Sequence, residues 1–452
     1  MPPTKGIAPG RSRQHVPSRV PRAAALLVFL VAVWSSVLRV SASESSLFSA
    51  SPINDLGTGT YLGFQGGLYP GGDNSPSSDH LGAGLAHAGS VVARDTFGNP
   101  SPPGKIVLVS IGMSNTTQEF CNANNPAPCN SWSFVGQATA DPLVNHSTLV
   151  LVNGAASGQS AATWNFPTAA NYDRIRDTDL VPAALSEAQV QIGWVKVANP
   201  GPTASLPAGN ADAYTLETQM GDIVRAMRVR YPNLQLVYFS SRIYAGYATT
   251  SLNPEPYAYE SGFAVKWLIQ AQIDQRRGDF SDHRAGQLSD AVAPWIGWGA
   301  YLWASGATPR SDGVTWQPAD LSSDGTHPSS AGQQKVGSLL LSFFKSDATS
   351  RPWFLAQAEP PPPAASFSYA LAMPRASHTF RFTDTSTGNP ASWSWSFGDG
   401  TVSAIQSPIH VYGQAGSYSV TLTASNSGGA TSAMQTVTVN RCSLCTRVLP
   451  AR

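Results

Sequence analysis

The sequence predicts an α/β domain with a mostly parallel sheet, followed by a small all-β sandwich. Two observations support this prediction. Between residues 105 and 350, short apolar runs alternate with segments of helical periodicity, which is typical of a parallel sheet covered by helices on both faces. Beyond residue 366, short runs rich in Thr, Val and Ser alternate with Gly, Asn and Pro turns, which is typical of an antiparallel sandwich.

The composition limits the classes of partner. The chain has 452 residues, enough for two or three domains of roughly 100–200 residues each. Its 28 Lys and Arg residues nearly balance its 27 Asp and Glu residues, and charged residues make up only 12% of the chain. Because nucleic-acid binding needs a basic surface, we do not expect a nucleic-acid partner.

The N-terminus has the pattern of a secretory signal peptide over residues 1–42. Four arginines precede an apolar run at 23–38, and Val40-Ser41-Ala42 offers small residues for cleavage. The run contains two serines and is shorter than the roughly 18 residues of a membrane span. We expect a secreted or cell-surface protein with no membrane span after cleavage; retention by an N-terminal signal anchor is the alternative.

The four cysteines form two pairs along the chain. Cys121 and Cys129 enclose a polar segment that contains proline, and we expect a disulfide between them in an oxidising compartment. Cys442 and Cys445 form a C-x-x-C motif in the C-terminal tail, residues 441–452. A single C-x-x-C motif is weak support for zinc or redox chemistry, and the pairing of these two cysteines stays open.

The α/β elements follow a glycine-rich lead-in at residues 43–104, which lacks apolar periodicity. Four apolar runs predict buried strands, at residues 106–111, 148–152, 189–198 and 234–239. Apolar residues at helical spacing predict three helices, at residues 216–231, 262–276 and 330–344. Pro232 ends the first of these helices, and Ser330 is a suitable N-cap for the last.

A proline-rich linker at residues 351–365 precedes the sandwich at residues 366–440. The sandwich carries the segment WSFGDG at 395–400, then HVY at 410–412 and GSY at 416–418, and this series resembles the polycystic-kidney-disease (PKD) domain. The resemblance implies an immunoglobulin-like fold that acts as a spacer or contacts polysaccharide, protein or a cell surface. Its core is expected to contain the aromatic side chains of Trp395, Phe397, Tyr412 and Tyr418.

Two motifs in the α/β domain suggest nucleophilic catalysis. Ser114 follows the first predicted strand directly, at the carboxyl end, where open α/β sheets place their ligands. Far downstream, Asp324 and His327 stand three residues apart, just before the last predicted helix. A nucleophilic serine needs a base within hydrogen-bonding reach and a carboxylate that orients the imidazole, and these two residues can supply both.

The order of these motifs over residues 105–350 resembles that of the SGNH, or GDSL-like, hydrolase superfamily. The resemblance implies a three-layer α/β/α, flavodoxin-like fold and a serine hydrolase that cleaves ester bonds. It assigns Ser114 as the nucleophile, His327 as the general base and Asp324 as the carboxylate that orients the base. Gly158, after the second strand, would contribute an N–H group to the oxyanion hole together with that of Ser114.

Two blocks depart from the family pattern. Gly112-Met113-Ser114 stands where the family has Gly-Asp-Ser. GWVK at 193–196 stands where the family has Gly-x-Asn-Asp, which leaves Lys196 or Asn199 as candidate replacements for the side-chain amide of the oxyanion hole. A lysine ammonium can stabilise an oxyanion, although it is longer and differently directed than an amide.

The substrate class is suggested by an aromatic stretch between residues 295 and 316. Most of these side chains should pack beneath loops, but Trp298 and Trp303 are candidates to line a substrate groove, because flat aromatic faces suit sugar rings. Together with export, this favours acylated carbohydrate over the lipid, aryl and peptidoglycan esters that the same residues allow. The mechanism needs no metal or organic cofactor. Four other histidines lack metal-ligand spacing and are expected at the surface or in loops, namely His80, His87, His146 and His283.

Two alternatives to the hydrolase stay open. The altered block at residues 193–196 is compatible with a non-catalytic extracellular binding or adhesion protein, in which a degenerate SGNH scaffold accompanies the PKD domain. An acyltransferase that moves an acyl group to sugar rather than to water would share every residue named above.

Overall fold

The computed structural model describes residues 47–122, 128–279, 282–356, 361–372 and 378–441. The expected signal peptide at residues 1–42 and the pair Cys442 and Cys445 lie outside the described residues. The described chain contains two hydrophobic cores, one built from residues between 53 and 354 and the other from residues between 367 and 439.

The first core surrounds a five-stranded parallel sheet with the strand order β4-β3-β5-β6-β7. Its strands are β3 (Ile106–Gly112), β4 (Leu149–Val152), β5 (Val190–Lys196), β6 (Leu236–Phe239) and β7 (Trp295–Trp298). Numbered along the chain, this is the 2-1-3-4-5 order of flavodoxin-like sheets. The first four strands overlap the predicted runs. β7 was not predicted, because its buried tryptophans lie in a glycine-rich stretch without strand-like alternation.

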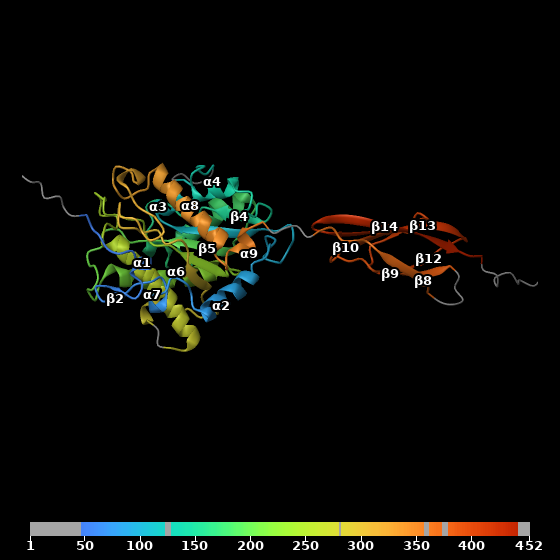
Figure 1. Cartoon of the computed structure of the whole chain (residues 1–452), viewed down its shortest axis with the longest axis horizontal. Helices are drawn as coiled ribbons and strands as arrows, with labels where there is room; N and C mark the ends of the chain where they lie inside the picture. Colours follow the sequence, from blue (N-terminus) through green and yellow to red (C-terminus); the bar gives the residue numbers. More distant parts are fainter. Residues whose placement is uncertain (1–46, 123–127, 280–281, 357–360, 373–377, 442–452) are drawn as a thin grey trace, which may run out of the picture. The chain divides into compact units, whose positions relative to one another are not determined.

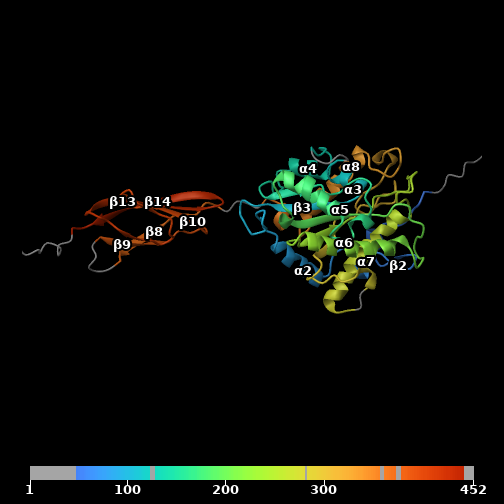
Figure 2. The ribbon, with the colours of Figure 1, turned by 180° about the vertical axis from the view of Figure 1, so that it is seen from behind.

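Helices cover both faces of this sheet. On one face α3 (Ser114–Phe120), α4 (Phe134–Ala140) and α8 (Ser330–Ser346) contact one another. On the other face α6 (Asp212–Arg230) packs against α7 (Tyr257–Arg277), and Figures 1 and 2 show the sheet between the two groups. The three-layer α/β/α prediction is therefore confirmed. Short helical segments complete the connections: η2 (Ala161–Trp164), α5 (Ala170–Arg174), η3 (Ile175–Leu180), η4 (Val181–Ala183), η5 (Glu187–Gln189), η6 (His283–Ala285) and η7 (Pro318–Asp320).

The central strands explain why the sequence pattern is apolar rather than alternating. Every residue of β3 and of β5 is buried, because both faces of an inner parallel strand are covered by helices. The last helix, α8, begins at Ser330, but its N-cap is Ser329, whose hydroxyl accepts a hydrogen bond from the Gly332 N–H at 3.4 Å. The expected cap at Ser330 is therefore wrong by one residue.

Residues 47–104 belong to the α/β domain and are not a separate lead-in. They form α1 (Ile53–Leu56), the hairpin strands β1 (Thr60–Tyr61) and β2 (Phe64–Gln65), η1 (Pro70–Gly72) and α2 (Ser78–Gly89). Ile53 and Tyr69 are buried in the first core. Gly67 has φ +75°, and a Cβ there would lie 2.2 Å from the Gly72 carbonyl carbon. The glycines that suggested a loop therefore allow tight turns against the core.

His80 lies in the interior, contrary to the expectation that it lies at the surface. Its residue is 2% exposed, and its ring stacks on Trp295 with 5.0 Å between the ring centroids. Burial lowers the pKa of His80 to about 4, although its Nε2 atom lies 2.9 Å from the Ile296 carbonyl oxygen. His80 is therefore a neutral core residue that ties α2 to β7, whereas His146 and His283 are exposed as expected.

The C-terminal boundary of the α/β domain lies later than expected. α9 (Arg351–Phe354) buries Trp353 and Phe354 in the first core, and the Ala356 N–H donates to the Leu143 carbonyl at 2.9 Å. Residues 351–356 are therefore part of the domain rather than the start of the linker. Proline in the flanking sequence marked the linker, but the two aromatic residues before it determine where the core ends.

The second core lies between two antiparallel sheets with the strand orders β11-β10-β13-β14 and β12-β9-β8. Trp395, Phe397 and Tyr412 are buried in it, and Trp393 and Tyr418 pack against it, which agrees with the expected immunoglobulin-like sandwich. The strands are β8 (Phe367–Leu371), β9 (Thr379–Asp384), β10 (Ser392–Ser396), β11 (Val402–Ser403), β12 (Ile409–Val411), β13 (Gly416–Asn426) and β14 (Gly429–Val439).

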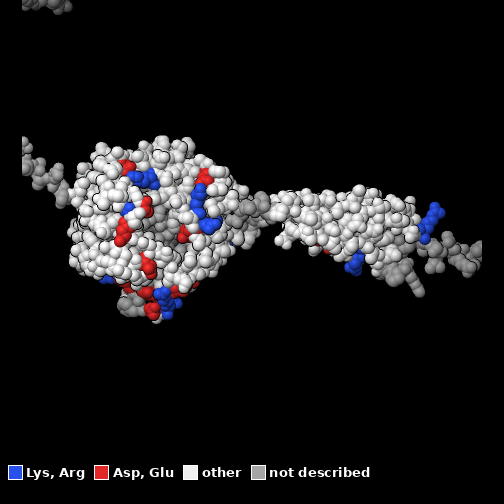
Figure 3. Space-filling view, in the orientation of Figure 1, with Lys and Arg blue, Asp and Glu red and all other residues white. Residues whose placement is uncertain are grey.

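The surface reflects the low charge of the sequence. On the face shown in Figure 3, acidic and basic side chains are scattered among larger areas that carry neither. Within the described residues, every helix is too short or too polar to span a bilayer.

Candidate active site

The turn from β3 into α3 places Ser114 at the carboxyl end of the sheet. Gly112 ends β3, and a Cβ at this position would lie 2.2 Å from the Lys196 carbonyl oxygen of the neighbouring strand, so only glycine fits there. The Thr116 hydroxyl donates to the same carbonyl at 2.6 Å and accepts from the Met113 N–H at 3.2 Å. These contacts hold Ser114 as the first residue of α3.

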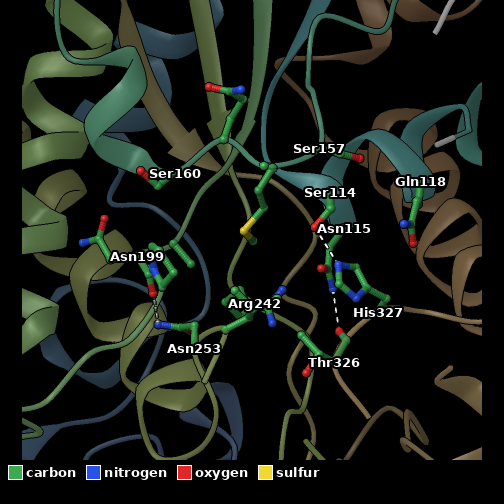
Figure 4. A pocket seen from close by; sticks show the side chains of 16 residues that line it. Ser114, Asn115, Gln118, Ser157, Ser160, Asn199, Arg242, Asn253, Thr326 and His327 are labelled. Atoms are coloured by element: carbon green, nitrogen blue, oxygen red, sulfur yellow. Dashed lines mark hydrogen bonds between the residues drawn. The ribbon is translucent and has the colours of Figure 1, made fainter. Parts of the chain in front are cut away.

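The structure brings Ser114, His327 and Asp324 together. The Ser114 Oγ atom lies 2.8 Å from His327 Nε2, and His327 Nδ1 lies 2.6 Å from Asp324 Oδ2. Figure 4 shows the side chains of Ser114 and His327 directed toward each other. A carboxylate can only accept, so it selects the tautomer with a proton on Nδ1. That tautomer leaves Nε2 free to accept the serine proton, which is the arrangement of a nucleophile with its general base.

The loop that carries Asp324 and His327 is held by its own backbone. Asp324 Oδ1 accepts from the N–H groups of Thr326 at 2.9 Å and of His327 at 3.0 Å. Burial raises the pKa of Asp324, but the hydrogen bonds from the His327 ring and these two N–H groups outweigh it and hold the pKa below its usual range. Asp324 is therefore ionised at neutral pH and can orient the imidazole.

A second contact joins this loop to the serine helix. The Asn115 side-chain amide, which is 2% exposed, donates to the Thr326 carbonyl at 2.9 Å. The residue next to the serine therefore bonds the residue next to the histidine. This cross-link fixes the distance between Ser114 and His327.

Ser114 and His327 open into a pocket with a volume of about 450 Å³, within the range of small-molecule sites. Gly158, from the segment after β4, lines the same pocket and has φ +76°, which favours glycine. The structure thus brings together Ser114 and Gly158, the two expected N–H donors of the oxyanion hole. Further lining residues are Gln118, Ser157, Gln159, Ser160, Ala198, Asn199, Pro200, Arg242, Leu252 and Asn253.

Lys196, an expected oxyanion donor, does not line this pocket. Its side chain has no exposed surface and donates to Glu119 Oε1 at 2.5 Å. Burial raises the pKa of Glu119 and lowers that of Lys196 to about 8, while the attraction between the two groups opposes both effects. The side chain at the end of β5 therefore points into the protein interior, where its counter-charge on α3 lies, and the expected oxyanion role is wrong.

Asn199, the other candidate, reaches the pocket but is held elsewhere. Its amide nitrogen donates to Gln219 at 2.8 Å and to Asp212 at 3.3 Å, and Figure 4 shows the amide directed away from Ser114. Neither Lys196 nor Asn199 therefore directs a side-chain donor toward Ser114.

A substitution tests whether Lys196 is structural. We expect Lys196→Met to lower the free energy of unfolding by about 3–5 kcal/mol, because Glu119 would stay buried without its counter-charge. The double variant Glu119→Met/Lys196→Met should regain most of this stability. Urea denaturation of the three proteins measures both effects. A Lys196→Met protein with unchanged stability and lost turnover would contradict the structural role.

Trp298 and Trp303, expected to line a substrate groove, are core residues. Trp298 is 4% exposed and its indole N–H donates to the Leu68 carbonyl at 2.6 Å. Trp303 has no exposed surface, and its indole N–H donates to Glu255 at 2.7 Å. Neither lines the pocket at Ser114. The expectation is wrong because the segment at residues 47–104 packs against both side chains: Leu68 accepts from Trp298, and the Phe48 ring lies 6.3 Å from that of Trp303.

The expected disulfide between Cys121 and Cys129 is present. Cys121 caps the end of α3, and its carbonyl accepts from the Asn130 N–H at 3.1 Å. The disulfide therefore ties Cys129, in the segment that follows α3, back to the C-terminal end of that helix.

Sequence reasoning missed Arg242 and Asn253, both of which line the pocket. Arg242 follows β6 by three residues, at the same carboxyl edge as Ser114. A signal was available, because the predicted strand at 234–239 is followed directly by Ser240, Ser241 and Arg242. Asn253 stands in a longer loop, and no feature of the sequence singles it out.

The chain is similar to known proteins in two regions. The family model of the PKD domain matches residues 359–440, so this segment is a PKD domain. The PKD1 domain of the Vibrio cholerae metalloprotease PrtV is 32% identical over 17% of this chain and 98% of that chain, with a TM-score of 0.15.

Two further solved structures are similar to more than half of the chain. A putative GDSL-like lipase from Parabacteroides merdae is 12% identical over 58% of this chain and 99% of that chain, with a TM-score of 0.29. A carbohydrate esterase family 2 enzyme with a carbohydrate binding domain, from Corynascus thermopiles, is 12% identical over 54% of this chain and 66% of that chain, with a TM-score of 0.29. No curated protein matches the chain.

Proposed function

We propose that this protein is a secreted serine hydrolase that cleaves ester bonds, with Ser114 as nucleophile, His327 as general base and Asp324 as its orienting carboxylate. The observation that carries the proposal is the continuous hydrogen-bonded series from Ser114 Oγ to His327 Nε2 and from His327 Nδ1 to Asp324 Oδ2, at 2.8 Å and 2.6 Å. It ends in a pocket of about 450 Å³ at the carboxyl edge of the sheet.

The proposed reaction has two steps. Ser114 Oγ attacks the ester carbonyl while His327 Nε2 takes its proton, and the oxyanion of the tetrahedral intermediate accepts hydrogen bonds from the N–H groups of Ser114 and Gly158. His327 then returns the proton to the departing alcohol, which leaves an acyl-serine. Water, deprotonated by His327, attacks this acyl group, and the carboxylic acid leaves as Ser114 regains its proton.

The proposed substrate is an acylated carbohydrate or another extracellular ester. The pocket offers hydrogen-bonding groups to such a substrate, because eight of its sixteen lining residues are serine, asparagine or glutamine. Such side chains bond hydroxyl groups, which a sugar offers in number. The PKD domain would then contact polysaccharide or a cell surface, or act as a spacer.

A binding protein with a degenerate site is the second candidate. The absence of a family amide at residues 193–196 favours it, whereas the hydrogen bond between Ser114 and His327 does not, since a pure binding site has no need of an activated hydroxyl. Reactivity of the serine separates the two functions.

The test is covalent labelling of mature protein by a fluorophosphonate probe, followed by intact mass and peptide mapping. We expect one adduct, on Ser114, which is absent from Ser114→Ala and strongly reduced in His327→Ala. Ser342→Ala, which alters an exposed serine on α8, should label like the wild type. A folded wild-type protein that does not react would favour the binding-protein candidate.

A further inference from the structure

The pocket is lined by a buried cation to which the described part of the chain offers no hydrogen-bond partner. Arg242 is 1% exposed, and its Nε, Nη1 and Nη2 atoms have no hydrogen-bond acceptor among the described residues. It lines the pocket together with Ser114 and His327, and Figure 4 shows it among the labelled lining residues. A guanidinium has five N–H donors, and leaving them unsatisfied in the interior is costly.

The backbone at Arg242 is held firmly in place. The Arg242 N–H donates to the Ser261 hydroxyl at 3.1 Å, and this hydroxyl donates to the Ala258 carbonyl at 2.7 Å. Two residues earlier, the Ser240 N–H donates to the Val195 carbonyl at 3.1 Å. The segment after β6 is therefore anchored to α7 and β5. The guanidinium lacks a hydrogen-bond partner among the described residues although the backbone that carries it is held in place.

The acidic groups near Arg242 are engaged with other partners. Glu119 pairs with Lys196, and Asp324 bonds His327. Glu255 accepts from the N–H groups of Ala245 and Tyr259 and from the Trp303 indole. Burial lowers the pKa of Arg242, and attraction to these three carboxylates opposes the shift. The guanidinium stays charged at neutral pH, since arginine keeps its proton in proteins.

The rest of the pocket lining matches an anion. Among the described residues that line the pocket, none is Asp or Glu, and Arg242 is the one permanent cation. Asn253 also lines the pocket and is 2% exposed, and its Oδ1 atom has no donor among the described residues. A ligand with one negative charge and neighbouring hydroxyl groups would satisfy both side chains.

We infer that Arg242 binds a carboxylate of the substrate, so that the enzyme acts on esters of an acidic sugar, with Asn253 accepting from a sugar hydroxyl. The inference rests on the proposed function and specifies its substrate class. A carboxylate can bond the guanidinium fork through two parallel hydrogen bonds, as a phosphate also can. The charge favours the carboxylate, because its single charge balances one arginine, whereas a phosphate monoester would bring nearly two.

The test compares a matched pair of esters, methyl galacturonoside and methyl galactoside acetylated at the same hydroxyl. The first carries a carboxylate where the second carries a hydroxymethyl group. We expect Arg242→Gln to lower kcat/KM for the acidic ester about 100-fold, mostly through KM, and to change kcat/KM for the neutral ester less than threefold. Arg242→Lys, which keeps the charge but not the fork, should fall between wild type and Arg242→Gln.

The melting temperature distinguishes a ligand-binding arginine from a structural one, because replacing a structural arginine would lower it. Because the guanidinium has no partner within the described protein, Arg242→Gln should melt at the wild-type temperature or above it. The matched control is Arg176→Gln, which removes the same charge from an ion pair on a partly exposed surface. This variant should leave kcat/KM unchanged for both the acidic and the neutral ester.

Three kinetic or folding outcomes would overturn the inference. An equal loss of kcat on both esters would make Arg242 an oxyanion donor. No loss on either would mean that the guanidinium bonds only water. An Arg242→Gln protein that melts much lower or does not fold would show a structural role.

A binding measurement separates this inference from the proposed function. Calorimetry with Ser114→Ala should detect methyl galacturonoside but not methyl galactoside, and adding Arg242→Gln should abolish the difference. If the wild type cleaves neither ester but this preference is observed, the carboxylate site stands and the hydrolase does not. Cleavage of the neutral ester without any preference would leave the hydrolase and overturn the carboxylate site.

Discussion

Ser114→Ala is expected to lower kcat for a cleaved ester by about 10⁴-fold or more, with the melting temperature unchanged. The reason is chemical. The methyl group cannot form the acyl intermediate, and the residual rate then depends on water and on the N–H donors at Ser114 and Gly158. The Ser114 side chain makes one described hydrogen bond, to His327, so its loss should cost the fold little.

His327→Ala should cause a comparable loss, and the double variant should be no worse than either single variant. When two groups act together in one step, removing either one already abolishes their joint contribution to the rate, so the losses of the two single variants do not add in the double variant. Steady-state kinetics with purified single and double variants, with Ser342→Ala as the control, measures this. Losses that multiply in the double variant would show that the two residues act in separate steps.

Asp324→Asn is expected to lower kcat about 10³–10⁴-fold. The asparagine oxygen can still accept from the Thr326 and His327 N–H groups, as Oδ1 does now at 2.9 Å and 3.0 Å, so the loop should keep its shape. The asparagine NH₂ group, however, would donate to His327 Nδ1. This places the ring proton on Nε2, where it can no longer accept from Ser114.

The pH dependence of this variant separates orientation from folding. Hydrogen bonds from the His327 ring and from the Thr326 and His327 N–H groups hold the pKa of Asp324 below its usual range. The contribution of Asp324 to stability is therefore present above the pKa of the unfolded chain and is lost only as the pH falls through the lower folded pKa. The melting temperatures of wild type and Asp324→Asn should therefore differ less in acid than at pH 7. Asp222→Asn, on the surface of α6, is the control. An Asp324→Asn protein with wild-type kcat would show that the aspartate has no role in the mechanism.

Much of the fold follows from local sequence patterns. The run at 106–111 is continuously apolar because β3 is covered on both faces, and the spacing of Leu216, Met220 and Ile223 matches residues that α6 buries. The placement of Ser114 and His327 could be predicted for the same reason. Ser114 directly follows a predicted strand, at the edge where parallel strands bring their carboxyl ends together, and His327 stands just before a predicted helix.

The errors share one cause, which is that burial depends on partners far along the chain. Residues 47–104 look like a loop until their apolar side chains meet the core. Trp298 and Trp303 look like a sugar platform until that segment covers them. Lys196 is a candidate oxyanion donor until Glu119, on α3, is placed beside it.

The sequence by itself therefore determined four of the five strands of the parallel sheet, the sandwich after residue 366, and the positions of Ser114, Asp324 and His327 beside a predicted strand or helix, because periodicity and short spacings are local properties. Only the tertiary structure decided which charged groups are paired and which are not. Lys196 pairs with a carboxylate and does not line the pocket, whereas Arg242 lines it and has no hydrogen-bonded carboxylate among the described residues. Pairing in the interior depends on which segments pack together, and a linear pattern of residues does not contain those distances.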